Sequence, residues 1–387
     1  MESAYLILQQ PVSIYIHLPW CLHKCAYCDF NSHATAPNQF PEQQYTQQLI
    51  ADLTQAAPLI DGREVQSIFI GGGTPSLFSP ESIAKILAAC ARLTQLKPEC
   101  EITLETNPGT FEYQKFAEFL SAGINRISVG AQSFNNEHLT SLGRIHDASE
   151  AINALETAHE IGFKHINVDL MFGLPNQSVE DALVDIQMAC RQNVDHISYY
   201  QLTLEPNTIF HRYPPKLPNE DTNYDIQVNG LQALEDAEYR RYEVSAYAQA
   251  DAQCVHNTNY WQYGDYLGAG AGAHSKITTK EGILRNQRTR QPDSYIQAVI
   301  DRSHVLQQHL VDSDQLIFEF MLNNLRLVDG FTSETFTRTT GLCWSLAEHQ
   351  VNAQIQQGLM EKTKHLYRAS SHGYQYLDEL TQRFLPN

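Results

Sequence analysis

The alternation of short β-branched runs with longer helical patterns constrains the fold of this chain more than any other feature. Runs rich in β-branched residues are typical of strands. The stretches between them carry helix signals: Ser79 precedes a proline, Asp147 and Ser178 are good N-caps, and Gly123 and Gly162 stand where C-caps are expected. Strands that alternate with helices predict parallel βαβ units.

Six such units are expected in the first half of the chain. The strands are predicted at Ser13–Ile16, Ser67–Ile70, Glu101–Leu104, Arg126–Val129, His165–Asp169 and His196–Gln201. The helices are predicted at Glu42–Ala57, Pro80–Leu93, Phe111–Ala122, Ala148–Ile161 and Val179–Gln192. Six units are fewer than the eight of a closed barrel, so this α/β pattern favours an open, partial (β/α)6 barrel of TIM type.

Beyond about residue 205 the pattern changes, and a smaller, mostly helical domain is expected at the C-terminus. A helix at Asp221–Ala237 and an irregular glycine-rich stretch at Tyr260–Gly272 come first. The later helices are predicted at Asp314–Leu325, Thr332–Thr339 and Leu346–Gln357, followed by a hairpin of Leu366–Ser370 and Tyr374–Leu377 that turns at His372-Gly373. Three helices before a hairpin resemble a winged helix. We therefore expect a core at residues 1–240, a connecting segment at 241–312 and a C-terminal domain at 313–387.

The charge of the chain argues against general binding to nucleic acid or anionic membrane. The formal net charge is −18, and phosphate binding needs a clustered positive field. An acidic chain can still carry a local basic pocket. The start, Met1–Tyr5, lacks a basic region, the apolar run Tyr5–Leu8 is too short for a secretion signal, and no window approaches the roughly 18 apolar residues of a membrane helix. We expect a cytoplasmic protein with reduced thiols and no membrane span.

Polar or glycine-rich residues follow four successive predicted strands. These segments are Gly71–Pro75, Glu105–Gly109, Gly130–Ser133 and the residues from Asp169 to Pro175. In parallel barrels the site is built from residues at the carboxyl ends of strands. The sequence therefore predicts that these segments meet at one rim.

Three of the eight cysteines, Cys21, Cys25 and Cys28, crowd into one loop directly after the first predicted strand. Their spacing of three residues and then two lets one loop place three thiolates around a [4Fe–4S] cubane, leaving one iron without a protein ligand. The alternative is a structural zinc site, which needs a fourth ligand such as His17, His23 or His33. The spacing differs from the usual zinc spacings and favours the cluster.

The Cys-x3-Cys-x2-Cys run, with an aromatic residue before the last cysteine, resembles the signature of the radical S-adenosylmethionine (SAM) superfamily. Four longer runs, Tyr15–Cys21, Glu105–Gly109, Asn125–Phe134 and Leu142–His146, are more specifically similar to oxygen-independent coproporphyrinogen III oxidase and the HemW heme chaperones. The resemblance covers nearly the whole chain and implies a HemN-type C-terminal domain. Carried over by position, it implies SAM contacts at Tyr15, Gly72, Gly73, Thr74, Glu105, Gln132, Arg144 and Asp169.

The run His256-Asn257-Thr258-Asn259-Tyr260-Trp261 matches the His-Asn-x-x-Tyr-Trp heme motif of the HemW proteins. Histidine is a common axial ligand of heme iron, and aromatic faces suit a flat porphyrin. The resemblance implies heme binding at His256, Asn257, Tyr260 and Trp261. Without the resemblance, the six residues favour a packed loop in which the histidine is merely hydrogen-bonded, and the resemblance reverses that preference.

Two functions compete. The leading hypothesis is a heme chaperone with a SAM-ligated [4Fe–4S] cluster, which passes heme to acceptor hemoproteins such as respiratory enzymes and can form a homodimer. The alternative is a coproporphyrinogen III oxidase, a radical SAM decarboxylase. The oxidase pattern carries a further cysteine where this chain has Phe30, which favours the chaperone and leaves open whether the protein is an enzyme at all.

Overall fold

The protein is described by a computed structural model that covers residues 10–36, 39–110 and 112–386. The expectation about a secretion signal concerns the first eight residues, which lie outside the described ranges, as does Phe111, the first residue of one predicted helix. Within the described ranges, no helix combines the length and the apolar character needed to cross a membrane.

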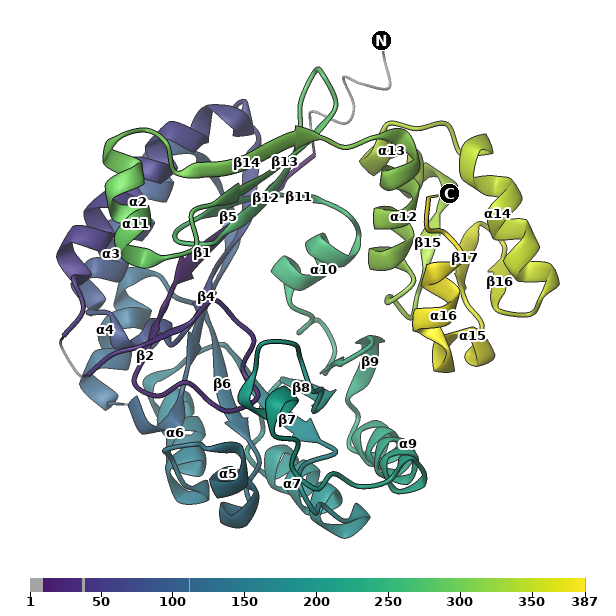
Figure 1. Ribbon diagram of the computed structural model, residues 1–387. Coiled ribbons are helices and arrows are strands. Elements are labelled where there is room, and N and C mark those ends of the chain that lie inside the picture. Colours follow the sequence, from purple (N-terminus) through teal and green to yellow (C-terminus); the bar gives the residue numbers. More distant parts are fainter. Residues whose placement is uncertain (1–9, 37–38, 111, 387) are drawn as a thin grey trace.

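Six parallel strands form the centre of one twelve-stranded sheet (Figure 1). They pair in chain order and are β1 (Val12–Leu18), β4 (Glu64–Gly72), β5 (Gln95–Thr106), β6 (Arg126–Gln132), β7 (His165–Phe172) and β8 (His196–Gln201). All six predicted strands are confirmed, and five are longer than their β-branched runs. The sheet ends at β14 on one side and β9 on the other, so the partial barrel is open, as expected.

Helices cover the convex side of this curved sheet (Figure 1). They are α2 (Glu42–Ala56), α3 (Pro80–Leu93), α4 (Tyr113–Ala122), α5 (Asn136–Leu142), α6 (Ala148–Ile161), α7 (Val179–Arg191) and α9 (Glu220–Asp236). The short α8 (Ile209–Arg212) instead lies against the cysteine loop, where the Phe210 N–H donates to Ala26 O at 3.0 Å. The predicted caps are present: the Ser79 side chain accepts the N–H of Ser82, Asp147 and Ser178 form capping boxes, and Gly123 ends α4 with a φ of 113°.

Residues 241–312 extend the same sheet at both edges. Beyond β8 lie β10 (Ala246–Ala248) and β9 (Arg240–Glu243), and beyond β1 lie β11 (Asp265–Ala269), β12 (His274–Thr278), β13 (Ile283–Arg288) and β14 (Val305–Leu310). The prediction of an irregular Tyr260–Gly272 stretch is therefore wrong, since β11 pairs in parallel with β1. The strand was not predicted because glycine is uncommon in strand interiors. Glycine is needed at position 268, since a Cβ there would clash with the carbonyl oxygen of His274.

The C-terminal region has the expected order of helices followed by a hairpin. Helices α12 (Ser313–Asn324), α13 (Ser333–Thr340) and α14 (Ser345–Gln356) precede β16 (Met360–Thr363) and β17 (Leu366–Ala369), and β15 (Phe331–Thr332) pairs with β17. The predicted hairpin partner Tyr374–Leu377 is wrong. The hairpin turns earlier, at Lys364, and His372-Gly373 belongs to α15 (Ser371–Gln375), which α16 (Leu377–Gln382) follows. Gly373 is needed for close packing, because its Cβ would clash with the carbonyl oxygen of Leu359.

Candidate functional site

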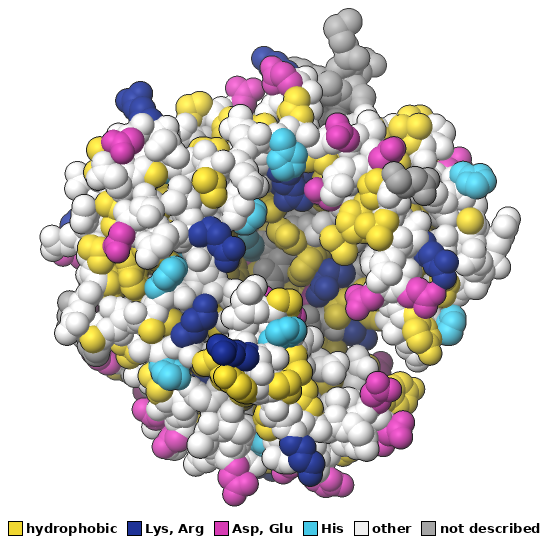
Figure 2. Space-filling model, viewed as in Figure 1, with side chains coloured by type: hydrophobic (Ala, Val, Ile, Leu, Met, Phe, Trp, Pro, Cys, Tyr) yellow, Lys and Arg dark blue, Asp and Glu magenta, His cyan; other side chains and the backbone are white. Residues whose placement is uncertain are grey.

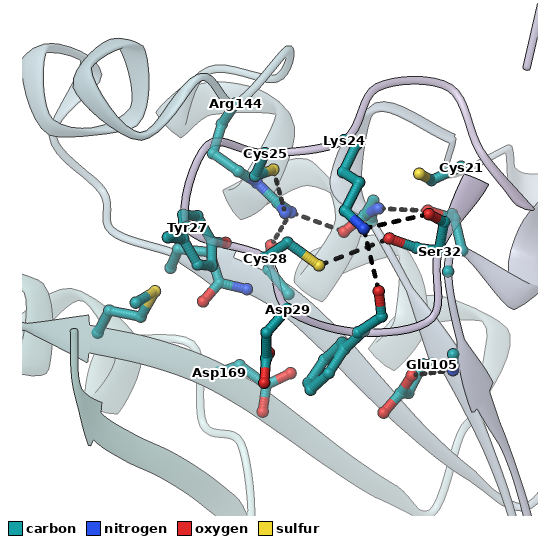
Figure 3. Close-up of a pocket in the computed structure, with 18 of the residues that line it drawn as sticks. Cys21, Lys24, Cys25, Tyr27, Cys28, Asp29, Ser32, Glu105, Arg144 and Asp169 are labelled. Carbon is teal, nitrogen blue, oxygen red and sulfur yellow. Dashed lines mark hydrogen bonds between the residues drawn. The ribbon is translucent and has the colours of Figure 1, made fainter. Parts of the chain in front are cut away.

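A cavity of about 320 Å³ lies at the carboxyl ends of the central strands. The three cysteines predicted to hold the cluster line it, on a loop above Glu105 and Asp169 (Figure 3). Seven of the eight residues carried over as SAM contacts also line it: Gly72, Gly73, Thr74, Glu105, Gln132, Arg144 and Asp169. The strand-end argument therefore holds, because parallel strands bring these distant segments to one rim.

Hydrogen bonds within the chain hold the cysteine loop in shape. Cys21 ends β2 (Trp20–Cys21), which pairs with β3 (His33–Ala34). The Lys24 ammonium donates to the carbonyl oxygens of Phe30 and Ser32, at 3.1 and 3.3 Å, and so closes the loop. Burial raises the pKa of Cys21 to about 11, so a metal that binds this sulfur has to displace its proton.

The donor set fits a cubane better than a single metal ion. Among the described residues, no three His, Cys, Asp or Glu side chains converge closely enough for one ion, whereas each thiolate of a cubane binds a different iron. His17, weighed as a fourth zinc ligand, is occupied at both ring nitrogens: Nδ1 lies 3.0 Å from the Tyr15 hydroxyl and Nε2 lies 2.9 Å from the Asn31 carbonyl oxygen.

The glycine-rich end of β4 lies against the chain segment that leads into the cysteine loop. The Gly73 N–H donates to Leu18 O at 2.8 Å, and the Thr74 N–H donates to Trp20 O at 2.7 Å. A Cβ on Gly73 would clash with the carbonyl oxygen of Trp20, the residue before Cys21. Glycine is required here because two backbones approach closely.

Replacing Gly73 with alanine should therefore displace the cysteine loop. We expect Gly73→Ala to lower the free energy of unfolding by about 1–3 kcal/mol through overpacking, and to reduce the iron bound after anaerobic reconstitution. Thermal unfolding and iron analysis measure the two effects. Gly109→Ala is the control, since its Cβ would meet nothing nearer than 3.6 Å. Equal stability of the two variants would contradict the view that the close backbone contact at Gly73 holds the cysteine loop in place.

Two half-buried carboxylates, Glu105 and Asp169, and the guanidinium of Arg144 lie among the charged groups that line the cavity. Burial, with the Asp169 charge nearby, raises the pKa of Glu105 to about 7, although the Gly72 N–H donates to its Oε2 at 3.0 Å. Burial also raises the pKa of Asp169. Arg144 donates to Cys25 Sγ at 3.6 Å. Such a site offers acceptors for hydroxyl or amino groups and a donor for a carboxylate.

Two residues that are not among the carried-over SAM contacts join them, and one of these, Asn107, lies in the predicted rim segment Glu105–Gly109. Asn107 donates to Thr74 Oγ1 at 2.7 Å and accepts from Arg144 at 2.6 Å. The Tyr200 hydroxyl donates to Gln132 Oε1 at 2.7 Å. Both stand at the ends of parallel strands, so the strand-end rule contained the signal for them.

A second cavity, of about 830 Å³, adjoins the first on the concave side of the sheet. It shares Phe30, Gly72 and Glu105 with the first cavity. The four residues carried over as heme contacts, His256, Asn257, Tyr260 and Trp261, line it together. Tyr15, carried over as a SAM contact, lies on the wall of this second cavity.

Helix α10 (Val255–Trp261) presents these four residues and is held at its N-terminus by Glu101 of β5. The Glu101 carboxylate accepts the N–H groups of Val255 at 3.0 Å and His256 at 2.9 Å, where a negative charge favours a helix. The His256 ring lies 5.0 Å from that of Phe69, and burial lowers the pKa of His256 to about 3. The imidazole is therefore neutral, which is the form that binds metals.

Comparison with known proteins agrees with this arrangement. The Radical SAM superfamily matches residues 15–189, and the HemN C-terminal domain matches residues 311–376. Heme chaperone HemW of Haemophilus influenzae is 46% identical over 97% of this chain and 98% of its own length, and that of Escherichia coli is 44% identical over the same shares. The chain belongs to the HemW family. A bovine member of this wider group, radical S-adenosyl methionine domain-containing protein 1, mitochondrial, is 34% identical over 96% of this chain and 86% of its own length.

The HemW-family fold also resembles a solved structure. Coproporphyrinogen III oxidase (HemN) from Escherichia coli superimposes with a TM-score of 0.82 over 99% of this chain and 92% of that one. At 22% identity, this likeness concerns the fold. It supports the radical SAM barrel with its C-terminal domain.

Proposed function

We propose that this protein is a heme chaperone, which binds heme in the second cavity and passes it to acceptor hemoproteins such as respiratory enzymes. The observation that carries the proposal is the second cavity: it adjoins the cysteine-lined cavity, and His256 lies in its wall beside aromatic rings. Its volume lies within the range of roughly 300–1,000 Å³ that is usual for ligand pockets. The membership of the HemW family supports the same function.

Each cofactor would be held by residues that face one of the cavities. Cys21, Cys25 and Cys28 would hold the [4Fe–4S] cluster, and Glu105, Asp169 and Arg144, with the Gly72–Thr74 backbone, would hold SAM. When bound, the cluster supplies an open iron site for a small chelating ligand. Gly72 and Glu105 belong to both cavities. A ligand that binds in one cavity can therefore change the shape of the other cavity through these two residues.

Heme titration tests the proposal directly. We expect the wild-type protein to shift the Soret band of added heme and to saturate. His256→Ala should weaken binding by at least about 10- to 100-fold, which is the loss caused by removing even an outer-shell partner of a metal ligand. His159→Ala, on the outer helix α6, is the control and should bind as the wild type does. A wild-type protein that leaves the Soret band unchanged would overturn the proposal.

An anaerobic assay separates the chaperone from the oxidase. With reductant, SAM and coproporphyrinogen III, we expect no catalytic formation of protoporphyrinogen. Repeated turnover to protoporphyrinogen would instead identify the protein as the decarboxylase, whereas uncoupled 5′-deoxyadenosine without that product would leave the chaperone function standing.

A further inference from the structure

The second cavity has one basic wall, although the chain carries a net charge of −18. Arg285, Arg290 and His274 line it, and Glu105 is the one carboxylate among its described lining residues. Glu105 lies at the boundary with the first cavity. Figure 2 shows Lys, Arg and His side chains gathered around the hollow at the centre of this face, with Asp and Glu mostly at the periphery. This wall is a local basic pocket, which the negative net charge of the whole chain does not reveal.

Arg285 of β13 is held rigidly and keeps donors to spare. Its Nε and one terminal nitrogen donate to Glu319 Oε2 at 3.2 and 2.6 Å, and the other terminal nitrogen donates to the Tyr266 hydroxyl at 2.8 Å. A guanidinium carries five N–H donors. Those three bonds leave two N–H groups for a ligand.

Arg290 lies in the loop between β13 and α11 (Pro292–Ile300) and is exposed. Among the ion pairs that the described residues form, none includes Arg290, whereas Arg285 pairs with Glu319. Burial lowers the pKa of His274, and the charges of Arg285 and Arg290 lower it further. Glu319 therefore offsets the charge of Arg285, and Arg290 supplies the positive charge of the wall that pairs with no carboxylate of the described residues, while Arg285 supplies free N–H donors.

Asn31, just beyond the cysteine loop, fixes this wall in place. Its side-chain amide donates to the carbonyl oxygens of Ala271 at 2.9 Å and Arg290 at 2.8 Å. A Cβ on Gly272 would lie 2.5 Å from the Asn31 amide nitrogen, so glycine permits the contact. The loop that carries Arg290 is thus anchored to the segment that follows Cys28.

We infer that Arg285 and Arg290 form an anion subsite that binds the two carboxylate side chains of the porphyrin. The inference rests on the proposed function and deepens it. Aromatic side chains of the cavity, among them Phe69, Tyr260 and Trp261, suit the apolar disc, and guanidinium groups match carboxylates in geometry and charge. The subsite determines which edge of the porphyrin faces β12 and β13.

Titration with iron protoporphyrin IX and with its dimethyl ester tests the subsite, because the ester lacks the two charges. We expect the wild type to bind the free acid more tightly, and Arg290→Gln to weaken that binding by about five- to tenfold while leaving ester affinity unchanged. The difference should shrink as salt is raised. Arg285→Lys is the second variant, because it keeps a charge beside Glu319 but loses the planar fork.

The control is Arg92→Gln, an exposed arginine on the outer helix α3, which should bind both porphyrins as the wild type does. If the wild type binds the free acid but both cavity variants bind it equally well, or if they lose affinity for the ester to the same extent, the subsite is wrong and the chaperone proposal stands. If the wild type shifts the Soret band of neither porphyrin, the proposed function fails and the subsite fails with it.

Discussion

Replacing Cys25 with serine will abolish assembly of the iron–sulfur cluster. Wild-type protein reconstituted without oxygen should contain close to four irons and four sulfides per chain, and Cys25→Ser only traces of either. The three thiols line one cavity on one loop, so the remaining two lack the ligands to retain a cubane. Iron and acid-labile sulfide analysis, with the visible absorbance of the cluster, measures the loss.

Cys190→Ser provides the matched control. Cys190 of α7 is half-buried like Cys25 and lies away from the loop, so its loss should leave the iron and sulfide content unchanged. A Cys25→Ser protein that retains the full content would show that this loop does not hold the cluster. The proposals about SAM binding and about an open iron site would then be wrong as well, because both depend on a cluster held by this loop.

The largest effect on stability is expected at Asp52 of α2, a fully buried carboxylate. It accepts from Arg288 Nε at 2.9 Å, from the Tyr295 hydroxyl at 2.8 Å and from the Gly270 N–H at 3.2 Å. Removing one partner leaves Arg288 as an uncompensated buried charge. We expect Asp52→Ala to lower the free energy of unfolding by about 3–5 kcal/mol, measured by denaturant unfolding.

Glu81→Ala is the control for a lost carboxylate. Glu81 pairs with Lys85 at 2.7 Å on the surface of α3, and solvent screens such an exposed pair so that its loss costs little stability. If Asp52→Ala and Glu81→Ala lowered the free energy of unfolding equally, the buried network around Asp52 would not contribute more than a surface ion pair. Since Asp52 ties α2 to β13, α11 and the end of β11, its loss should also loosen the segment that carries the basic wall.

Acid should weaken the same network. Burial by itself would raise the pKa of Asp52, but the Arg288 guanidinium and the His304 imidazole hold it below its ordinary value of 3.8. A depressed pKa in the folded state contributes stability above the ordinary pKa, and that contribution is lost as the pH falls through the folded value. Asp52→Asn should therefore show a shallower loss of stability than the wild type between pH 4 and lower values.

Local patterns were sufficient to predict the six central strands and the five long helices between them, but not the short α5. β8 and the helices α3 and α6 begin and end at the predicted residues, because caps and β-branched runs act within a few positions of the chain. The prediction of Tyr374–Leu377 as a hairpin strand was wrong because a contact distant in the sequence decides the structure there. Gly373 looks like a turn residue, and its close packing against Leu359, which is a tertiary contact, decides its role.

The sequence by itself determined the cysteine loop, the polar strand ends and the rim where they meet, since parallel strands of one sheet necessarily end on the same side. The tertiary structure alone decided the second cavity and its basic wall. Asn31 and Arg290 are 259 positions apart, and Glu101 and His256 are 155. Hydrogen-bond partners so far apart leave no periodic trace in the chain, because only the packed fold brings them within bonding distance.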